Sequence, residues 1–294
     1  MAGAPVRRIG LGITFRLAAV VAFGFMAVLV KLCAERGVNT FEIVFFRNAF
    51  AFIPIVITIL SSGGFGMLRT SRPGSHAIRS ILGVTGMVCG FAAMGMLPLT
   101  EFTAIMFCTP LLVTALSAPV LREKVSGHQW GAVIVGFCGM LILVRPDPVH
   151  MASIGVALAL LQVAGSAGAM LAIRQLGSTE SGPTIAFYFT VAATLVGLVA
   201  LPFVWTTPDR LTLLYLVLMG VAGGIGQLLL TQAYRLAPAA IVAPFDYATL
   251  LWNGLLGFLV WNELPRVTTV IGGLVVMASG LYVILRETRK PSAT

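Results

Sequence analysis

Charge is scarce in this sequence. Only 10% of its 294 residues are Asp, Glu, Lys or Arg, whereas soluble domains contain roughly 25%. Apolar residues make up 58% of the chain, and the mean hydropathy is +0.99. A water-soluble fold of this composition would have too little polar surface to cover its core. The soluble globular class is therefore excluded, and we predict an integral membrane protein surrounded by the lipid bilayer.

Catalytic and ligand-binding motifs are also missing. The three histidines, His76, His128 and His150, lie far apart at segment ends, and the four cysteines lack the spacing of a metal site. There is no P-loop and no HExxH-like element. No basic block with interleaved aromatic residues accompanies the net charge of +9, so we expect no nucleic-acid partner. We predict no catalytic residue, no metal and no cofactor, and an integral-membrane enzyme is the least favoured function.

The sequence consists instead of an almost continuous series of apolar runs. A helix that crosses the hydrocarbon needs about 20 mostly apolar residues, and breaks such as "REKVSGHQ" and "TTPDR" separate runs of that length. The expected helices span residues 13–33, 41–60, 76–97, 100–121, 128–145, 153–174, 183–204, 211–235, 239–261 and 267–286. We therefore predict an all-α fold of ten transmembrane helices. Consecutive helices should be antiparallel, because most connections are short.

Lys and Arg are distributed unequally between the helix ends. Thirteen lie at ends on the side of the N-terminus and five at the opposite ends, with Arg47 counted on neither side. Loops rich in Lys and Arg tend to stay in the cytoplasm. Both termini are therefore predicted to be cytoplasmic, and an even number of spans agrees with this.

The chain repeats itself at a spacing of 140 residues. The positions that agree are Gly83 with Gly223, Gly86 with Gly226, Pro98 with Pro238, and Glu123 with Glu263. They indicate two homologous units of five helices, residues 1–147 and 148–294. Because five is odd, the second unit must enter the membrane inverted. Transporters built from inverted repeats bind their substrate between the units near the membrane midplane, and rocking of the units exposes the site to each side in turn.

Two tracts resemble the closing parts of EamA domains. The shared features are a proline before the fourth helix of the unit, a glutamate that closes that helix, and a glycine-rich fifth helix. They occur at Pro98 and Glu123 in residues 97–146, and at Pro238, Glu263 and Gly272–Gly273 in residues 237–285. Over nearly its whole length, the chain resembles the EamA-domain family of the drug/metabolite transporter superfamily.

The resemblance implies ten helices around a central cavity, with helices 1–4 and 6–9 lining it and helices 5 and 10 at the periphery. It also implies a secondary transporter in the bacterial cytoplasmic (inner) membrane that works by alternating access. Members of this family carry small polar or zwitterionic metabolites, so the expected solute is similar to an amino acid, S-adenosylmethionine or riboflavin. A passive facilitator or channel-like protein is the alternative.

Arg47 interrupts the apolar run "EIVFFRNAFAFIPIVITIL" of residues 42–60. A charged side chain costs about 2.5 to 3.5 kcal/mol at the centre of a membrane helix, and less near the interface. We expect Arg47, together with Asn48, to face the cavity and to attract an anionic or polarised group of the solute. The alternatives are an ion pair with Glu42 or Glu101, or a side chain that extends to the membrane surface.

Other polar side chains in the spans complete the expected site. The substrate-binding candidates are Gln162, Ser166, Tyr188, Gln232, Tyr234, Tyr247 and Asn253. Hydrogen bonding between helices is the alternative role for their amides. Asp246 and Glu101 are candidates for proton coupling, because a carboxylate in a low-dielectric site can exchange a proton near neutral pH. The structural alternatives for Asp246 are hydrogen bonding to the backbone loosened after Pro244 or pairing with an arginine. The alternative for Glu101 is a place at a helix start, where the helix dipole favours it.

Several repeated features have a structural interpretation. Glu123 and Glu263 lie at helix ends, where we expect them to cap helices or form ion pairs rather than bind solute. The pairs Gly86/Gly90 and Gly220/Gly224 have the GxxxG spacing that lets helices approach closely.

Overall fold

The computed structural model describes residues 3–288 apart from 62, 122–126, 145–153, 177–178, 237–244, 246–247 and 265. Every regular element in these residues is helical. The elements are α1 (Gly3–Glu35), α2 (Thr40–Ser61), the 3-10 helix η1 (Phe65–Leu68), α3 (Pro73–Met96), α4 (Leu99–Met106), α5 (Cys108–Leu121), α6 (Gly127–Val144), α8 (Ile154–Leu176), α9 (Gly182–Val204), α10 (Arg210–Leu236), α12 (Ala248–Trp261) and α13 (Val267–Thr288).

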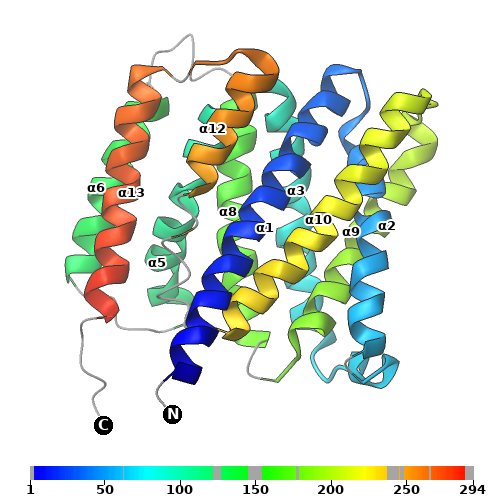
Figure 1. The fold of residues 1–294 in the computed structure, drawn as a ribbon, viewed down its shortest axis with the longest axis horizontal. Helices are drawn as coiled ribbons and strands as arrows, with labels where there is room; N and C mark the ends of the chain where they lie inside the picture. Colours follow the sequence, from blue (N-terminus) through cyan, green and yellow to red (C-terminus); the bar gives the residue numbers. More distant parts are fainter. Residues whose placement is uncertain are drawn as a thin grey trace.

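The helices form one bundle (Figure 1). Six of them, α1, α2, α3, α8, α9 and α10, are long and apolar enough to cross a membrane, and shorter apolar helices occupy the remaining predicted spans. Only Phe107 separates α4 from α5, so these two helices make up one predicted span. The predicted start of the ninth span, and the predicted repeat boundary at 147–148, lie outside the described residues. The all-α membrane fold with ten spans is confirmed.

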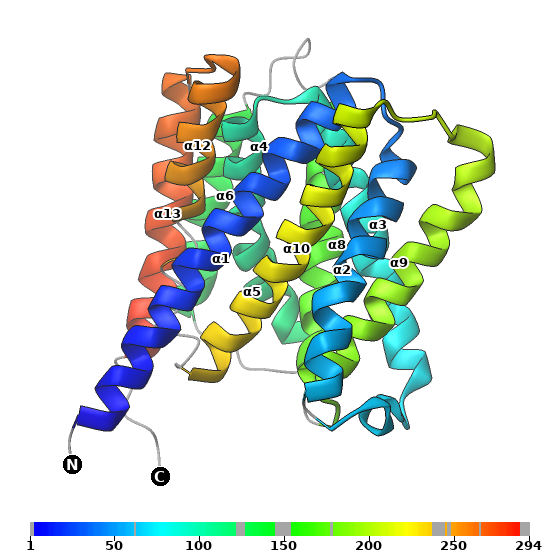
Figure 2. The same ribbon diagram turned by 45° about the vertical axis from the view of Figure 1, so that its right-hand side comes forward.

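Helix α1 begins and helix α13 ends at the same end of the bundle (Figures 1 and 2), which we call the terminal end; the other is the distal end. Two helices begin with a side chain that caps their N-terminus. The Ser181 hydroxyl accepts a hydrogen bond from the Thr184 amide at the start of α9, and Asp209 accepts one from the Thr212 amide at the start of α10. Hydrogen bonds from the Thr212 hydroxyl, which has the larger effect, and from the Thr212 amide hold the pKa of Asp209 below its usual value.

The most extensive helix contacts join the two repeats. α1 packs along α10, and α3 packs along α8. Each of these contacts joins the first helix of one repeat to the third helix of the other, so exchanging the repeats converts one pair into the other. The next most extensive contacts, α6 with α13 and α2 with α9, join equivalent helices of the two repeats. This pattern is what two inverted five-helix repeats require.

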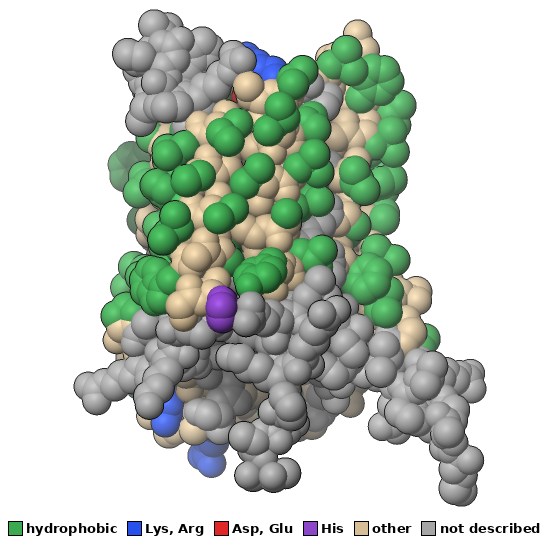
Figure 3. All heavy atoms as spheres, turned by 90° about the vertical axis from the view of Figure 1, so that its left-hand side faces the viewer, with side chains coloured by type: hydrophobic (Ala, Val, Ile, Leu, Met, Phe, Trp, Pro, Cys, Tyr) green, Lys and Arg blue, Asp and Glu red, His purple; other side chains and the backbone are tan. Residues whose placement is uncertain are grey.

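The helices α6 and α13 form one edge of the bundle (Figure 1). The side chains of Ile134 and Phe137 on α6, and of Ile271 and Leu274 on α13, are exposed. Apolar side chains of this kind are spread over the face shown in Figure 3. A surface of this composition suits contact with lipid chains, and the peripheral position expected for helices 5 and 10 is confirmed.

Glycine allows the helices of the two repeats to approach closely. A Cβ atom at Gly165 would lie 2.8 Å from the carbonyl oxygen of Leu82 and 2.9 Å from the Cα of Gly86, so the backbones of α8 and α3 are almost in contact. A Cβ at Gly224 would lie 3.2 Å from the Cα of Ala51 on α2. The glycine pairs predicted from their spacing therefore occupy packing positions between the repeats.

We expect Gly165→Ala to lower the free energy of unfolding by about 1–3 kcal/mol, because neither backbone can move away from the new methyl group. Gly131→Ala on α6 is the matched control, since nothing lies within 4 Å of a Cβ atom there. Alanine favours helix more than glycine does, so the control should be neutral or slightly more stable. Thermal unfolding of the detergent-solubilised variants measures the difference, and equal Tm values for both would contradict the close packing of α3 and α8.

Candidate functional site

Arg47 lies in the interior of the bundle, with 8% of its surface exposed. Gly223 on α10 leaves room for it, because a Cβ atom at Gly223 would lie 3.2 Å from Arg47 Nε. Arg47 Nη1 donates a hydrogen bond to Asn48 Oδ1 at 2.8 Å, and Asn48 Nδ2 donates to the Val44 carbonyl at 2.7 Å. Arg47 Nε is buried and has no hydrogen-bond partner in the described part of the chain. Asn48 therefore orients a guanidinium group that keeps a free donor.

The two acids considered as partners of Arg47 are engaged elsewhere. Glu42 is fully buried, and its Oε2 atom accepts hydrogen bonds from the Thr206 hydroxyl at 3.0 Å and the Thr206 amide at 3.3 Å, while its Oε1 atom has no hydrogen-bond partner in the described part of the chain. Glu101 Oε1 lies 3.3 Å from Arg266 Nε. The ion pairs formed among the described residues do not include Arg47. Its burial also argues against a side chain that extends to the membrane surface.

A second arginine lies in the same region. Arg79 on α3 stacks on Phe189 of α9, with its Cζ atom 3.8 Å from the ring centroid. Its Nε and Nη1 atoms are buried and find no hydrogen-bond partner among the described residues. The positive charge of Arg47 repels the Arg79 guanidinium group. The sequence alone assigned Arg79 to the charged helix ends, because it lies only six residues after the start of α3.

Two of the predicted amides carry free acceptor atoms in the interior. Asn253 on α12 is 5% exposed and donates to the Thr103 hydroxyl at 2.9 Å, while its Oδ1 atom has no partner among the described residues. Gln162 on α8 packs against Gly90 of α3, where an added Cβ would lie 1.7 Å from Gln162 Oε1. That oxygen is likewise buried and unpaired within the described part. Ser166 lies one helical turn from Gln162 and is half-buried.

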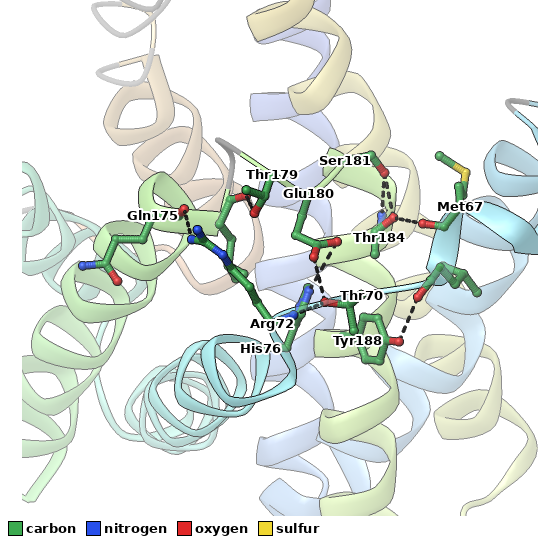
Figure 4. A network of polar contacts seen from close by, with 12 residues as sticks. Met67, Thr70, Arg72, His76, Gln175, Thr179, Glu180, Ser181, Thr184 and Tyr188 are labelled. Carbon is green, nitrogen blue, oxygen red and sulfur yellow. Dashed lines mark hydrogen bonds and ion pairs between the residues drawn. The ribbon is translucent and has the colours of Figure 1, made fainter.

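Tyr188 takes part in a different group, at the terminal end. Its hydroxyl donates to the Leu68 carbonyl at 2.9 Å, and its ring lies 4.5 Å from that of His76 (Figure 4). His76 Nε2 lies 3.8 Å from Glu180 Oε2, and both side chains are buried. Thr70 donates to the other Glu180 oxygen at 2.7 Å. The sequence did not reveal this titratable pair, because the two residues belong to different repeats.

The remaining predicted residues are not described by the structure. They are the side chains of Gln232 and Tyr234, and Asp246 and Tyr247 as whole residues. Glu123, the repeat counterpart of Glu263, also lies outside the described residues.

The distal end is held together by Glu263. Lys31 on α1 forms an ion pair with this carboxylate, and Lys31 Nζ lies 4.5 Å from the ring centroid of Trp261. The second Glu263 oxygen accepts a hydrogen bond from the Leu99 amide at 3.1 Å, which caps the N-terminus of α4. Glu263 thus joins α1 and α4 of the first repeat to α12 of the second. The structural role expected at this position is confirmed.

Three more polar contacts at this end join the repeats. They are Arg36 with Asp209 at 3.4 Å, Glu42 with Thr206 and Glu101 with Arg266. With the Lys31–Glu263 pair, these contacts bring helices of both repeats together at the distal end.

A cavity of about 530 Å³ lies between α2, α3 and α9. Its walls include Phe41, Ile81, Val84, Val88 and Val196, and none of the described residues that line it is charged. An apolar cavity of this kind fits a lipid chain better than a polar solute, so the candidate site is the interior around the two arginines.

The sequence model of the EamA-like transporter family matches residues 10–145 and 153–286. The chain is 27% identical over 284 residues to the S-adenosylmethionine uptake transporter of Rickettsia prowazekii (strain Madrid E), covering 96% of this chain and 95% of the relative. It is 31% identical over 283 residues to the pseudopaline exporter CntI of Pseudomonas aeruginosa (strain UCBPP-PA14), covering 95% and 97%.

A solved crystal structure is similar in fold, with a TM-score of 0.62 at 18% identity, covering 93% of this chain and 99% of the other. At this identity, the similarity establishes the fold alone. The family match spans both repeats, and the named relatives are transporters of small molecules. The chain therefore belongs to the EamA-like transporter family of the drug/metabolite transporter superfamily, and it is a multi-pass membrane transporter of small metabolites rather than an enzyme.

Proposed function

We propose that the chain is a secondary transporter that binds a small polar or zwitterionic metabolite at Arg47 and moves it across the cytoplasmic membrane by alternating access. Arg47 of α2 is buried against α10, and its Nε donor has no hydrogen-bond partner among the described residues. This observation carries the proposal. Within the described residues no acid pairs with this cation, so an anionic or polarised group of the solute completes its coordination. Asn48, Gln162, Ser166 and Asn253 supply further polar groups for the solute.

The relatives support a metabolite as the solute without fixing the direction of transport. One is named as an uptake transporter and the other as an exporter. We retain Gln232, Tyr234 and Tyr247 as predicted solute contacts. Tyr188 is reassigned to the group at the terminal end, because its hydroxyl already donates to a backbone carbonyl.

Alternating access requires closures between the repeats that can open and close. We place both termini on the cytoplasmic side of a bacterial inner membrane, so the distal end faces outward. The Lys31–Glu263 pair at the distal end then closes the outer side of the site. The α2–α9 contact is supported by polar bonds at both ends, Glu42 with Thr206 at the distal end and Tyr188 with Leu68 at the terminal end. We therefore assign the moving side of the bundle to α4 and α12 and the pivot to α2 and α9.

Uptake into proteoliposomes tests the function. A screen of amino acids, nucleosides, S-adenosylmethionine and riboflavin should identify at least one solute with saturable, competitor-sensitive flux. Flux that rises linearly with concentration would favour the passive facilitator or channel-like alternative. Empty liposomes, and liposomes that contain the Arg47→Ala variant, are the controls.

We expect transport to be coupled to protons through Asp246, which lies in the predicted ninth span. Glu101 is less suited to this role, because its carboxylate is already paired with Arg266. Asp246→Asn should abolish the response of solute flux to an imposed pH gradient, and Glu101→Gln should leave that response intact. Flux through both variants is measured with and without a gradient, and coupling that persists in Asp246→Asn would contradict the assignment.

A further inference from the structure

We propose that Arg79 and Arg47 form a two-arginine site that binds an oxyanion group of the solute, a carboxylate or a phosphate. This proposal rests on the transporter function proposed above and specifies the chemical class of its substrate. Arg79 contributes its in-plane N–H groups, and Arg47 contributes the free Nε of a guanidinium group oriented by Asn48.

The first argument is the electrostatic cost of the arrangement without a ligand. The Arg47 side chain is buried and the Arg79 side chain is half-buried, and the positive charge of Arg47 repels the Arg79 guanidinium group. Three of their nitrogen atoms, Arg47 Nε and Arg79 Nε and Nη1, are buried with no hydrogen-bond partner in the described residues. Buried donors are almost always satisfied in native proteins, and unpaired buried charges are strongly unfavourable. An anion between the two groups removes the repulsion and satisfies the donors.

The contact with Phe189 does not remove the need for a ligand. The Arg79 guanidinium group lies over the Phe189 ring, with the Cζ atom 3.8 Å from the ring centroid. Stacking of this kind stabilises the cation through the ring quadrupole. All five N–H groups of a guanidinium lie in its plane, so stacking leaves them free. Phe189 therefore holds Arg79 in a fixed plane from which it can bind two oxygens of one oxyanion group.

The second argument is that the second repeat has no arginine at the positions equivalent to Arg47 and Arg79. Gly83 and Gly223 are equivalent positions of the two repeats. A Cβ at Gly223 would lie 2.9 Å from Met26 Sδ and 3.2 Å from Arg47 Nε, whereas a Cβ at Gly83 would lie 2.9 Å from Arg79 Nη1 and 3.0 Å from the Phe189 ring. The second repeat thus contributes an apolar ring beside Gly83, whereas the first repeat contributes Arg47 beside Gly223.

Arg79 has an apolar counterpart as well. At the spacing of 140 residues it corresponds to Met219, which is fully buried. The scaffold thus tolerates apolar side chains at both positions in the second repeat. Both charges come from the first repeat, so their function is separate from that of holding the helices together.

Binding measurements with matched acid and neutral probes test the proposal. The probes are succinate with succinamide, glutarate with glutaramide, and glycerol 3-phosphate with glycerol, added to the purified full-length protein. We expect an acid probe to bind about tenfold to a hundredfold more tightly than its neutral partner, since charge-assisted hydrogen bonds are strong. The phosphate pair and the carboxylate pairs show separately which oxyanion the site prefers.

Arg79→Gln should reduce the affinity for the acid probe by about tenfold to a hundredfold. The affinity for the neutral probe should not change. Arg79→Lys keeps the charge but not the planar fork, so it should give an intermediate affinity. Arg69→Gln, at an exposed position after η1, is the matched control and should bind like the wild type. The Tm of the ligand-free Arg79→Gln variant should equal or exceed that of the wild type.

Two results would overturn the proposal. One is saturable transport of a solute by a wild-type protein that binds acid and neutral probes equally; this leaves the transporter function intact. The other is an Arg79→Gln variant with a lower Tm and an unchanged preference for acid probes, which would assign Arg79 a structural role through Phe189. An absence of saturable flux for every solute screened would instead contradict the proposed function itself.

Discussion

Arg47→Ala should abolish saturable transport of an anionic or zwitterionic solute while the protein still inserts and folds. The guanidinium group bonds only to its neighbour Asn48 among the described residues, and no acid there depends on it. Its removal therefore takes a charge out of the interior without leaving a counter-ion unpaired. Loss of one charge-assisted contact lowers affinity by about tenfold to a hundredfold, and loss of the orienting cation should lower flux further.

Uptake into proteoliposomes, with a size-exclusion profile and Tm for each variant, measures this effect. Asn48→Ala serves as the graded comparison, because it keeps the charge and removes the hydrogen bond that orients it. We expect it to raise the half-saturating concentration more than it lowers the maximal flux. Wild-type flux through Arg47→Ala, in a protein of normal Tm, would show that Arg47 does not contact the solute.

The symmetry of this protein could be predicted from the sequence, because it depends on residues with strong local preferences. Gly83 and Gly223 recur at a fixed spacing because at both positions a side chain fills the space that a Cβ atom would occupy, the Phe189 ring beside Gly83 and Arg47 beside Gly223. Apolar runs of similar length indicate membrane spans, because every span must cross a hydrocarbon core of the same thickness. Most described helix ends followed from proline, glycine and charge to within a few residues. The start of the first helix was predicted wrongly, because α1 begins at Gly3 whereas the apolar run that indicated the span begins at residue 13.

Side-chain partners between repeats could not be predicted, because no local pattern records them. Arg47 stood out only because its neighbours are apolar, whereas Arg79 lies near a helix end and was assigned to the membrane surface. In the structure the Arg79 side chain is half-buried, with Nε and Nη1 shielded from solvent, and it stacks on Phe189. The His76–Glu180 pair was missed for a related reason, since each residue alone resembles a solvated helix end.

The Lys31–Glu263 pair gives the second large expected effect. Lys31→Met should lower the free energy of unfolding by about 3–5 kcal/mol, because it leaves the partly buried Glu263 carboxylate without its cation. The exposed Arg36–Asp209 pair, with side chains 40% and 60% exposed, provides the matched control. Arg36→Gln should cost no more than about 1 kcal/mol, because water screens exposed ion pairs.

A double variant separates stability from the opening of the distal end. Lys31→Met/Glu263→Gln removes both charges and keeps an acceptor oxygen for the Leu99 amide, so most of the lost stability should return. The attraction between α1 and α12 is nevertheless gone, and the distal side should open more often. Cys33 is a native probe for this opening, because it is fully buried two residues beyond Lys31.

With the other three cysteines replaced by serine, a membrane-impermeant maleimide added from the distal side should label Cys33 several-fold faster in the double variant than in the parent protein. Solute flux should change with the labelling rate, because an outer closure that no longer holds alters the balance between inward-open and outward-open states. A double variant with restored Tm, unchanged labelling and unchanged flux would reduce the Lys31–Glu263 pair to a static helix cap, and the outer closure would then have to depend on the Glu101–Arg266 contact.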